Sequence, residues 1–331
     1  MSKPYHIELG LTDEDVIEMY RYMLLARKID ERMMLLNRAG KAAFTISGQG
    51  QEATQIGAGF ALDLTKDYIA PYYRDLGLVL VAGMTPKEVM LHLFAKAEDP
   101  NSGGRQMPGH YGHKAKRIIT GSSPVATQVP HAVGFALAAK YKKKDFVTLT
   151  TLGDGSTNQG DFHEGLNFAG VHKLPVITLV QNNKISISVP FEKQIASKNI
   201  AVRADSYGMP GIEVDGNNPL KVYEVMKKAH ERAKNGEGPT LIEAVSERLL
   251  AHSSDDNHNQ YRTEEELSEG KSRDCIVTFK KYLIEHKLIN DDIEKDMLEV
   301  ISKEVNEATQ YAENAAYADV ETINDFVYEK K

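Results

Sequence analysis

The chain has 331 residues, of which 41% are hydrophobic, so it can bury a large core and is not expected to be disordered. Its net charge is −7, and lysine and arginine are scattered, which excludes nucleic acid and anionic membrane surfaces as partners. The single cysteine, Cys275, forms no internal disulfide and is expected to be a small buried side chain. Residues 1–10 lack the apolar run of a signal peptide, so a cytoplasmic location is expected.

The N-terminal part of the chain is predicted to be helical. Thr12 and the three acids after it suit a helix N-terminus, apolar residues then recur at helical spacing, and Gly40 offers a stop. Two further helices are predicted over residues 51–62 and 85–97, the second capped by Thr85 with Pro86 at its first position. Residues 99–121 are rich in glycine and form either a functional loop or a disordered one.

Residues 118–139 are uncharged and long enough to cross a bilayer, but they contain too many polar groups to do so. We interpret them as a loop that leads into a buried helix. His131, at the start of that helix, is expected to be buried and hydrogen-bonded. His110, in the preceding glycine-rich loop, either faces a site or merely orders the loop.

From residue 145 onward, apolar strands alternate with helices. Strands are predicted at residues 146–152, 175–180 and 239–245, and helices at residues 161–172 and 220–235. This pattern indicates an α/β fold with a mostly parallel sheet that is covered by helices on both faces. We expect an N-terminal helical extension (1–40), a central α/β domain (41–262) and a charged helical C-terminal segment packed on it (263–331).

The ends of two successive strands carry polar side chains. Gly153-Asp154-Gly155 follows one strand and Asn182-Asn183 follows the next, and ligands of parallel sheets bind at the carboxyl ends of strands. The glycines would let a phosphate come close, but the carboxylate of Asp154 would repel it unless a cation lay between them. A Mg²⁺ ion suits this role, with the amide oxygen of Asn183 as a second ligand. The alternative for an isolated Gly-Asp-Gly is a plain turn.

Twenty-six residues separate Gly155 from Asn182, which is about what a loop, a helix and a strand use. This spacing between Gly-Asp-Gly and Asn-Asn resembles the signature of thiamine diphosphate enzymes. The wider sequence is similar to the alpha subunits of 2-oxo acid dehydrogenase E1 components, above all those for branched-chain 2-oxo acids. The similarity covers most of the chain and includes the motifs PYYRDLG (71–77), GGRQMPGHYG (103–112), GSSPVATQVPHAVG (121–134) and RLLAHSSDDNHNQYR (248–262).

The resemblance implies the thiamine diphosphate-binding fold, with thiamine diphosphate and Mg²⁺ as cofactors. It implies that the metal is held by the side chains of Asp154 and Asn183 and by the carbonyl of Ile185. The implied cofactor-binding residues are Tyr73, Arg74, Ser123, Val125, Gly153, Asp154, Gly155, Ser156, Asn183 and His252. For Tyr73 and Arg74 the alternative is a surface turn with an ion pair between Arg74 and Asp75. Gln181 stands where some relatives carry a phosphate-binding arginine, so no such contact is expected from it.

The resemblance also implies a catalytic histidine, His252, which assists acyl transfer from a loop over the cofactor. His258, in the same loop, is expected to be exposed and idle. Ser253 matches a regulatory phosphorylation site of animal relatives, but an ordinary loop serine is favoured. A structural K⁺ site is implied in the loop before the uncharged helix, unless its groups simply bond one another. The K⁺ site would use Ser122, Pro124, Thr127 and Gln128.

The implied activity is oxidative decarboxylation of a 2-oxo acid with acyl transfer to the lipoyl group of an E2 protein. The glutamate that activates the cofactor belongs to a beta subunit in this family, so we expect an α₂β₂ heterotetramer and an inactive isolated chain. Phe44 and Ile46 stand where pyruvate-class relatives usually show a histidine nearby, and they favour a branched aliphatic substrate. The alternatives are a pyruvate or acetoin dehydrogenase alpha subunit and a non-catalytic paralogue that binds a partner. A nicotinamide enzyme lacks its Gly-x-Gly-x-x-Gly fingerprint.

Overall fold

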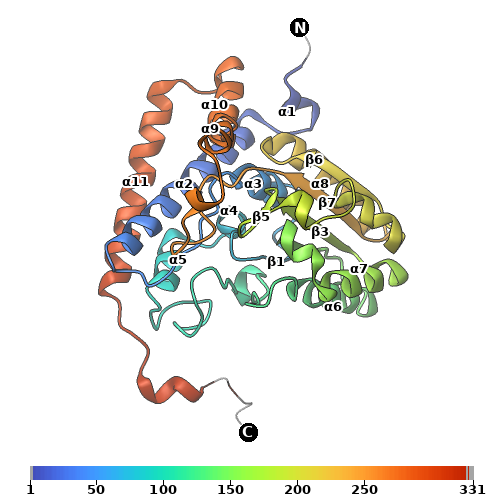
Figure 1. Ribbon diagram of the computed structural model, residues 1–331, viewed down its shortest axis with the longest axis horizontal. Coiled ribbons are helices and arrows are strands. Elements are labelled where there is room, and N and C mark those ends of the chain that lie inside the picture. The colour runs from blue at the N-terminus through green and yellow to red at the C-terminus, as the bar shows by residue number, and fades with distance from the viewer. Residues whose placement is uncertain (1–2, 326, 328–331) are drawn as a thin grey trace.

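The computed structural model describes residues 3–325 and 327, and a five-stranded parallel sheet forms its centre (Figure 1). The strand order is β1-β2-β3-β7-β6, and every neighbouring pair is parallel, as the sequence predicted. β2, β3 and β7 are buried almost throughout, which is why they appear in the sequence as continuous apolar runs. The strands are β1 (Tyr68–Ala70), β2 (Thr148–Gly153), β3 (Val176–Asn182), β6 (Gly211–Asp215) and β7 (Thr240–Val245).

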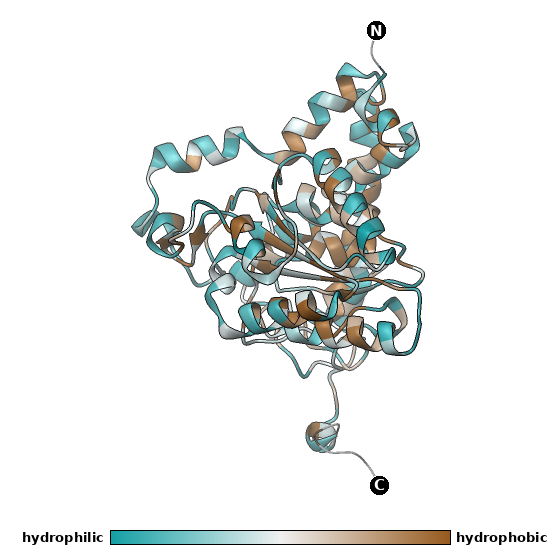
Figure 2. Ribbon diagram, turned by 90° about the vertical axis from the view of Figure 1, so that its right-hand side faces the viewer, coloured by the Kyte–Doolittle hydropathy of each residue, from teal (hydrophilic) through white to brown (hydrophobic). Residues whose placement is uncertain are grey.

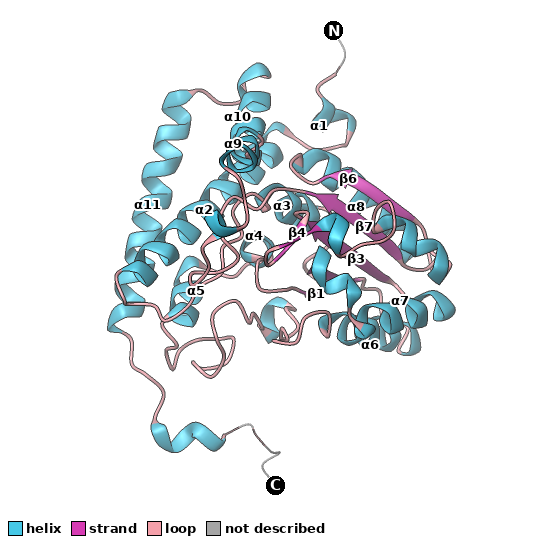
Figure 3. Cartoon of the chain, viewed as in Figure 1, coloured by secondary structure: helices cyan, strands magenta, loops and turns pink. Residues whose placement is uncertain are grey.

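Helices cover both faces of the sheet, so the predicted α/β layering is confirmed (Figure 3). On one face, α6 (Gln128–Tyr141) and α7 (Gly160–His172) pack on side chains such as Leu152 and Val180. On the other face, α3 (Glu52–Phe60) and α8 (Pro219–Lys234) pack on alternate side chains such as Leu149 and Ile177. Successive strand residues point to opposite faces, so each strand supplies both cores.

The N-terminal helices begin where the sequence predicts. α2 (Asp13–Arg38) starts with a capping box between Thr12 and Asp15, and α5 (Pro86–Leu93) starts with one between Thr85 and Glu88. α5 ends at Leu93, four residues earlier than predicted. The backbone of Ala95, two residues further on, is left-handed and cannot continue the helix. Two short helices, α1 (Tyr5–Glu8) and α4 (Leu76–Val81), were not predicted.

The C-terminal part is helical, as expected, and its helices are α9 (Glu264–Ser272), α10 (Cys275–Glu285) and α11 (Asp291–Asn314). α10 and α11 pack on α2, and the side chain of Cys275 is fully buried and free, which confirms its predicted role. After α11 the chain extends away from the body, so that the 3₁₀ helix η6 (Val320–Asn324) stands apart from the sheet (Figures 1 and 2). The boundaries at residues 40 and 262 remain a prediction.

Residues 118–139 form a loop followed by α6, as interpreted from the sequence, and none of the described helices could span a membrane. The prediction for His131 was wrong, because its side chain is exposed on the outer side of α6. Figure 2 shows hydrophobic residues on one side of the outer helices and hydrophilic residues on the other. The remaining elements are a small hairpin of β4 (Ile185–Ser186) and β5 (Val189–Pro190), and the 3₁₀ helices η1 (Lys114–Lys116), η2 (Asp154–Asn158), η3 (Phe191–Lys193), η4 (Ala201–Tyr207) and η5 (His258–Gln260).

Candidate active site

Asp154 and Asn183 lie at the same edge of the sheet. β2 and β3 are neighbours, and Gly153 at the end of β2 is paired in register with Gln181 near the end of β3. Asp154 directly follows β2, and Asn183 directly follows β3. Parallel strands present their carboxyl ends together, and the predicted metal ligands therefore meet where a ligand of this fold would bind.

Asp154 is a buried carboxylate with few hydrogen bonds. It is 2% exposed, and its Oδ2 accepts one side-chain hydrogen bond, from Nε2 of Gln194 at 2.6 Å. Burial raises the pKa of Asp154 above its ordinary value, although the positive charges of Arg248 and Arg74 act in the opposite direction. Gln194 comes from a loop that no sequence motif marked. The carboxylate is held in place and keeps acceptor capacity for a further group.

The segment after β3 turns sharply toward Asp154. Oδ1 of Asn183 accepts a hydrogen bond from the backbone N–H of Ile185 at 3.3 Å, and Lys184 between them is left-handed. The turn leads into the β4–β5 hairpin, whose Ser186 lies against Gly155. A Cβ at position 155 would lie 2.0 Å from Oγ of Ser186, so only glycine fits here. The second glycine of the motif thus admits the hairpin that carries Ile185.

Arg74 is buried in this region and forms no ion pair with an acid among the described residues. Its Nη1 donates to the carbonyl of Ser47 at 2.6 Å, and its Nη2 donates to Nδ1 and to the carbonyl of His252 at 2.9 and 3.1 Å. The alternative of a surface turn with an Arg74–Asp75 ion pair is wrong, because Arg74 is 2% exposed and Asp75 is bonded elsewhere. Asp75 accepts from Gln181 Nε2 at 2.5 Å, from the N–H of Tyr72 at 2.9 Å and from the hydroxyl of Thr151.

His252 is held as a neutral imidazole. A guanidinium has only donors, so Nδ1 of His252 accepts from Arg74 and the ring proton lies on Nε2. Burial, and then the positive charges of Arg74 and Arg248, lower the pKa of His252 to about 4. The ring of Tyr73 stands edge-on to it, with the centroids 6.3 Å apart. Three of the predicted site residues, Tyr73, Arg74 and His252, are therefore in contact with one another.

Arg248 is a site residue that sequence reasoning did not single out. Its side chain is 2% exposed, and Nη2 donates to the carbonyl of Ile187 at 2.9 Å and to the hydroxyl of Tyr261 at 3.0 Å. Nε and Nη1 are buried and find no acceptor among the described residues. Burial, and then the charge of Arg74, lower the pKa of Arg248. Buried donors without acceptors are rare in proteins, so these two N–H groups indicate a binding position for an anion.

A magnesium-bound diphosphate fits this donor set. Two buried guanidiniums, Arg74 and Arg248, form no ion pair with any described acid. Two carboxylates lie near them, Asp154 and Asp256, and Asp256 is already bound to the N–H of His252 at 2.7 Å and to the hydroxyl of Tyr261. The described residues contain no cluster of three His, Cys, Asp or Glu side chains that could hold a metal. A metal here would thus use amide and carbonyl oxygens as well, which is the donor set that Asn183 and Ile185 supply.

The loop expected to meet the far end of the cofactor lies at the surface. Ser123, Pro124 and Val125 are exposed, and Oγ of Ser123 donates to Nε2 of His110 at 2.5 Å, while Nδ1 of His110 donates to the carbonyl of Met107. Of the two roles left open for His110, facing a site or ordering the loop, these bonds support the second, because they tie the loop of His110 to Ser123. Gly153, Gly155 and Ser156 lie at the start of η2 rather than at the N-terminus of α7.

Two of the four residues proposed for K⁺ already form side-chain hydrogen bonds with other parts of the chain. Thr127 Oγ1 donates to Asp161 at 2.8 Å, and Gln128 Nε2 donates to the carbonyl of Thr151 at 2.8 Å. The carbonyls of Ser122 and Pro124 accept no side-chain hydrogen bond from the described residues, and the K⁺ site remains a prediction. His258 was expected to be exposed, which was wrong, because its ring is half-buried. Its Nδ1 has no hydrogen-bond partner among the described residues. Ser253 is a half-buried loop serine.

Comparison with known proteins agrees with this geometry. Residues 20–321 match the family model described as dehydrogenase E1 component. The chain is 61% identical over 330 residues to the 2-oxoisovalerate dehydrogenase subunit alpha of Bacillus subtilis (strain 168), with all of both chains covered. It is 37% identical to the pyruvate dehydrogenase E1 component subunits alpha of Staphylococcus aureus (strain Mu50) and Staphylococcus epidermidis, covering 96% and 97% of this chain and 84% of each relative.

Proposed function

This chain belongs to the dehydrogenase E1 component family, and we propose that it is the alpha subunit of an enzyme that oxidatively decarboxylates branched-chain 2-oxo acids. The observation that carries the proposal is that buried Asp154 lies close enough to two guanidiniums, Arg74 and Arg248, to feel their charge, while neither forms an ion pair with any described acid. This arrangement suits thiamine diphosphate with Mg²⁺, because the metal offsets the carboxylate and the arginines offset the phosphates.

The residues divide the work of binding between metal and phosphates. Asp154, Asn183 and the carbonyl of Ile185 would hold Mg²⁺, and the backbone of Gly153, Gly155 and Ser156 at the start of η2 would lie against the phosphates. Arg248 would donate to phosphate oxygens through Nε and Nη1, the two buried atoms without acceptors. Arg74 would support the same anion beside Tyr73.

His252 holds a proton at a defined atom. Its Nδ1 is occupied by Arg74, so Nε2–H is the atom left to donate or exchange a proton during acyl transfer to a lipoyl group. Bound phosphates would offset the charges of Arg74 and Arg248 and so raise the pKa of His252 toward its ordinary value. When bound, thiamine diphosphate supplies the carbanion chemistry, and the chain supplies orientation and charge.

A beta subunit would complete the site. Ser123 and Val125, which are predicted to meet the aminopyrimidine, are exposed in this chain, so that end of the cofactor would face water without a second chain. Large apolar side chains are also exposed on α6 and α7, including Phe135, Phe168 and Val171. We therefore propose the α₂β₂ assembly, a cytoplasmic location and acyl transfer to an E2 lipoyl domain as parts of the same function.

The substrate class rests on the relatives and on one segment. The relative that is 61% identical over its full length is a 2-oxoisovalerate dehydrogenase subunit, and the 37% identical relatives are pyruvate dehydrogenase subunits. Phe44 and Ile46 are half-buried apolar side chains in the segment that meets Arg74. Two extra carbons in the substrate, at about 0.8 kcal/mol each, would favour a branched acid over pyruvate about tenfold.

Substrate kinetics on the complex reconstituted with its beta subunit test this proposal. We expect kcat/KM for 3-methyl-2-oxobutanoate to exceed that for pyruvate by about tenfold or more. Ile46→His should lower that ratio, whereas the matched control Ile46→Leu should keep it. A preference for pyruvate would indicate a pyruvate dehydrogenase instead. Failure of the complex to bind thiamine diphosphate with Mg²⁺ would indicate a non-catalytic paralogue.

A further inference from the structure

Residues 45–50 connect the two parts of the site that carry Arg74 and His252. The carbonyl of Ser47 accepts the hydrogen bond from Nη1 of Arg74 at 2.6 Å. Gly48 lies so close to Arg74 that a Cβ at position 48 would be 2.6 Å from the Arg74 carbonyl oxygen. The segment therefore fixes Arg74 from one side, by a hydrogen bond and by direct backbone contact.

The same segment also holds the loop of His252. The backbone N–H of Leu249 donates to the carbonyl of Gln49 at 3.1 Å, and the N–H of Ser254 donates to the carbonyl of Thr45 at 3.0 Å. These two bonds flank His252 in sequence. Since Arg74 itself donates to His252, the 45–50 segment, Arg74 and the His252 loop form one closed set of contacts.

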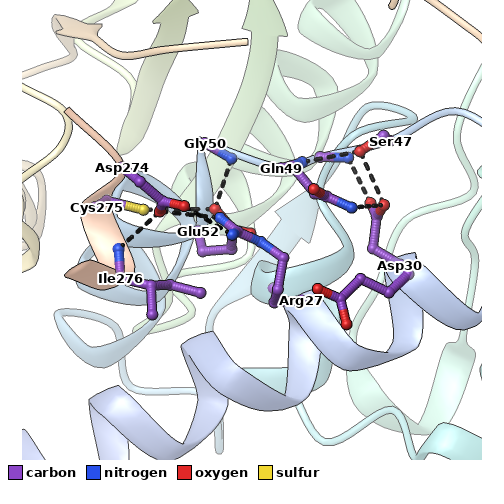
Figure 4. A network of polar contacts seen from close by, with 12 residues as sticks. Arg27, Asp30, Ser47, Gln49, Gly50, Glu52, Asp274, Cys275 and Ile276 are labelled. Atoms are coloured by element: carbon purple, nitrogen blue, oxygen red, sulfur yellow. Dashed lines mark hydrogen bonds and ion pairs between the residues drawn. The ribbon is translucent and has the colours of Figure 1, made fainter. Parts of the chain in front are cut away.

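Asp30 of α2 binds the middle of this segment from beneath (Figure 4). Its Oδ2 accepts from the N–H of Gly48 at 2.7 Å, and its Oδ1 accepts from Ser47 Oγ at 2.8 Å and from Gln49 Nε2 at 2.9 Å. Asp30 is 3% exposed. Among the described residues no cation forms an ion pair with it, because the nearby Arg27 is bound to Glu52 and Asp274. Within the described residues, all side-chain hydrogen bonds of Asp30 go to this one segment.

The charge of Asp30 does not serve the stability of the fold at neutral pH. Burial raises the pKa of Asp30 to about 6, because the three hydrogen bonds offset only part of the cost and Glu52 adds to it. A carboxyl whose folded pKa exceeds its unfolded value stabilises the fold below the unfolded pKa, and that contribution is lost as pH rises through about 6. At neutral pH the fold thus keeps a buried charge at a cost, which indicates another use for it.

We propose that Asp30 is a positioning residue for the active site, which holds residues 45–50 so that Arg74 and the His252 loop lie in register for the cofactor's phosphates. In this role Asp30 would act through Ser47, Gly48 and Gln49 and not by touching cofactor or substrate. The inference rests on the proposed function, because it assigns to Arg74 and His252 the roles given there.

The isosteric variant Asp30→Asn tests the proposal in the complex with the beta subunit. An amide can still accept from two donors, but its own N–H₂ would face the N–H of Gly48, so the segment must shift. We expect the Kd for thiamine diphosphate with Mg²⁺, measured by calorimetry, to rise about tenfold or more. We also expect faster hydrogen exchange at the amides of residues 47–50 and of residues 249–254.

Asp67→Asn is the matched control. Asp67 is a buried carboxylate that accepts from His230, Val147 and Asp63 at the opposite edge of the sheet. We expect this variant to lower the thermal midpoint but to leave the Kd and the exchange of residues 249–254 unchanged. If Asp30→Asn behaves in the same way, with a Kd within about twofold of the parent, Asp30 is merely structural and the proposal is overturned.

A milder variant covers the case in which Asp30→Asn does not fold. Gln49→Met removes one donor to Asp30 and leaves the backbone intact, and we expect a rise in Kd of about threefold, with faster exchange at residues 249–254. An unchanged Kd and unchanged exchange would overturn the proposal here too. Failure of the proposed function has a different signature, because the parent complex would then not bind thiamine diphosphate at all.

Discussion

Two buried arginine clusters in this chain differ in how their charges are met. Arg27 lies between Glu52 and Asp274, with N–O distances of 2.6 and 2.8 Å, and the same two acids also bind the N–H of Gly50 and cap α10 (Figure 4). Arg74 and Arg248 lie at the carboxyl edge of the sheet, and within residues 3–325 no acid is bound to either of them and two N–H groups of Arg248 have no acceptor.

The difference separates a structural charge from a functional one. A buried ion pair with complete hydrogen bonding holds α2, α3 and α10 together, and it needs nothing from outside the chain. Two buried guanidiniums that form no ion pair with any described acid are instead unfavourable until an anion binds. The same residue type therefore predicts opposite responses to mutation in the two clusters.

The largest effect is expected at the paired cluster. Arg27→Met leaves Glu52 and Asp274 buried without a cation, which should cost about 3–5 kcal/mol of unfolding free energy. Chemical denaturation of the chain would measure it. A loss below about 1 kcal/mol would show that the ion pairs of Arg27 are not structural, and the contrast with Arg74 and Arg248 would then be wrong.

The next effect is expected at Asp154, the proposed metal ligand. Asp154→Asn should weaken Mg²⁺-dependent thiamine diphosphate binding on the order of 100-fold, because a carboxylate ligand is lost. Since burial raises the pKa of Asp154, the same change should raise the thermal midpoint of the chain without cofactor. Calorimetry on the complex measures the loss of cofactor affinity, and a melting curve of the chain without cofactor measures the change in thermal midpoint. A lower midpoint would count against Asp154 as a metal ligand.

Arg248→Met should show the reverse of Arg27→Met. It removes an unpaired buried charge, so we expect no loss of stability without cofactor, whereas cofactor affinity should fall about 10- to 30-fold through the lost charge-assisted bonds. The comparison of melting curves with and without thiamine diphosphate measures both. Equal affinity in the variant and the parent would show that the two free N–H groups meet no phosphate.

The smallest effect concerns the protonation of His252. Its folded pKa of about 4 lies below the ordinary value, so the unfolded chain gains the proton first, and stability should fall as pH drops from about 6.5 toward 4. His252→Gln should flatten that decline. Because bound phosphates offset the nearby arginines, cofactor binding near pH 6 should take up protons, which calorimetry in buffers of different ionisation enthalpy detects. Proton uptake that persists in His252→Gln would assign it to another group.

The sequence predicted the buried strands and missed the marginal ones. β2, β3 and β7 are covered on both faces, so their apolar runs were visible. β1 has three residues, and β6 lies at the edge with exposed Glu213 and Asp215, so neither shows a continuous apolar run. His131 was misplaced for a related reason, because α6 is apolar on several sides and its pattern does not indicate which side faces the sheet.

The candidate site was predictable where a motif fixes a strand end. Asp154 and Asn183 follow β2 and β3, so their meeting follows from parallel pairing. The importance of Arg248 was not predictable in this way, because the lack of an acceptor around Nε and Nη1 is a property of packing among distant segments. Gln194, which donates to Asp154 from forty residues away, lies in a loop without any pattern.

Burial alternates along the segment that Asp30 holds. Thr45 and Ser47 are buried, while Phe44 and Ile46 between them are only half-buried. In an extended chain such alternation places the two pairs on opposite sides. On the proposal that Phe44 and Ile46 face the substrate, substitutions at positions 44 and 46 would alter substrate choice, while positions 45 and 47 keep the segment attached to the rest of the molecule. One short segment would then allow selectivity to change without loosening the loop of His252.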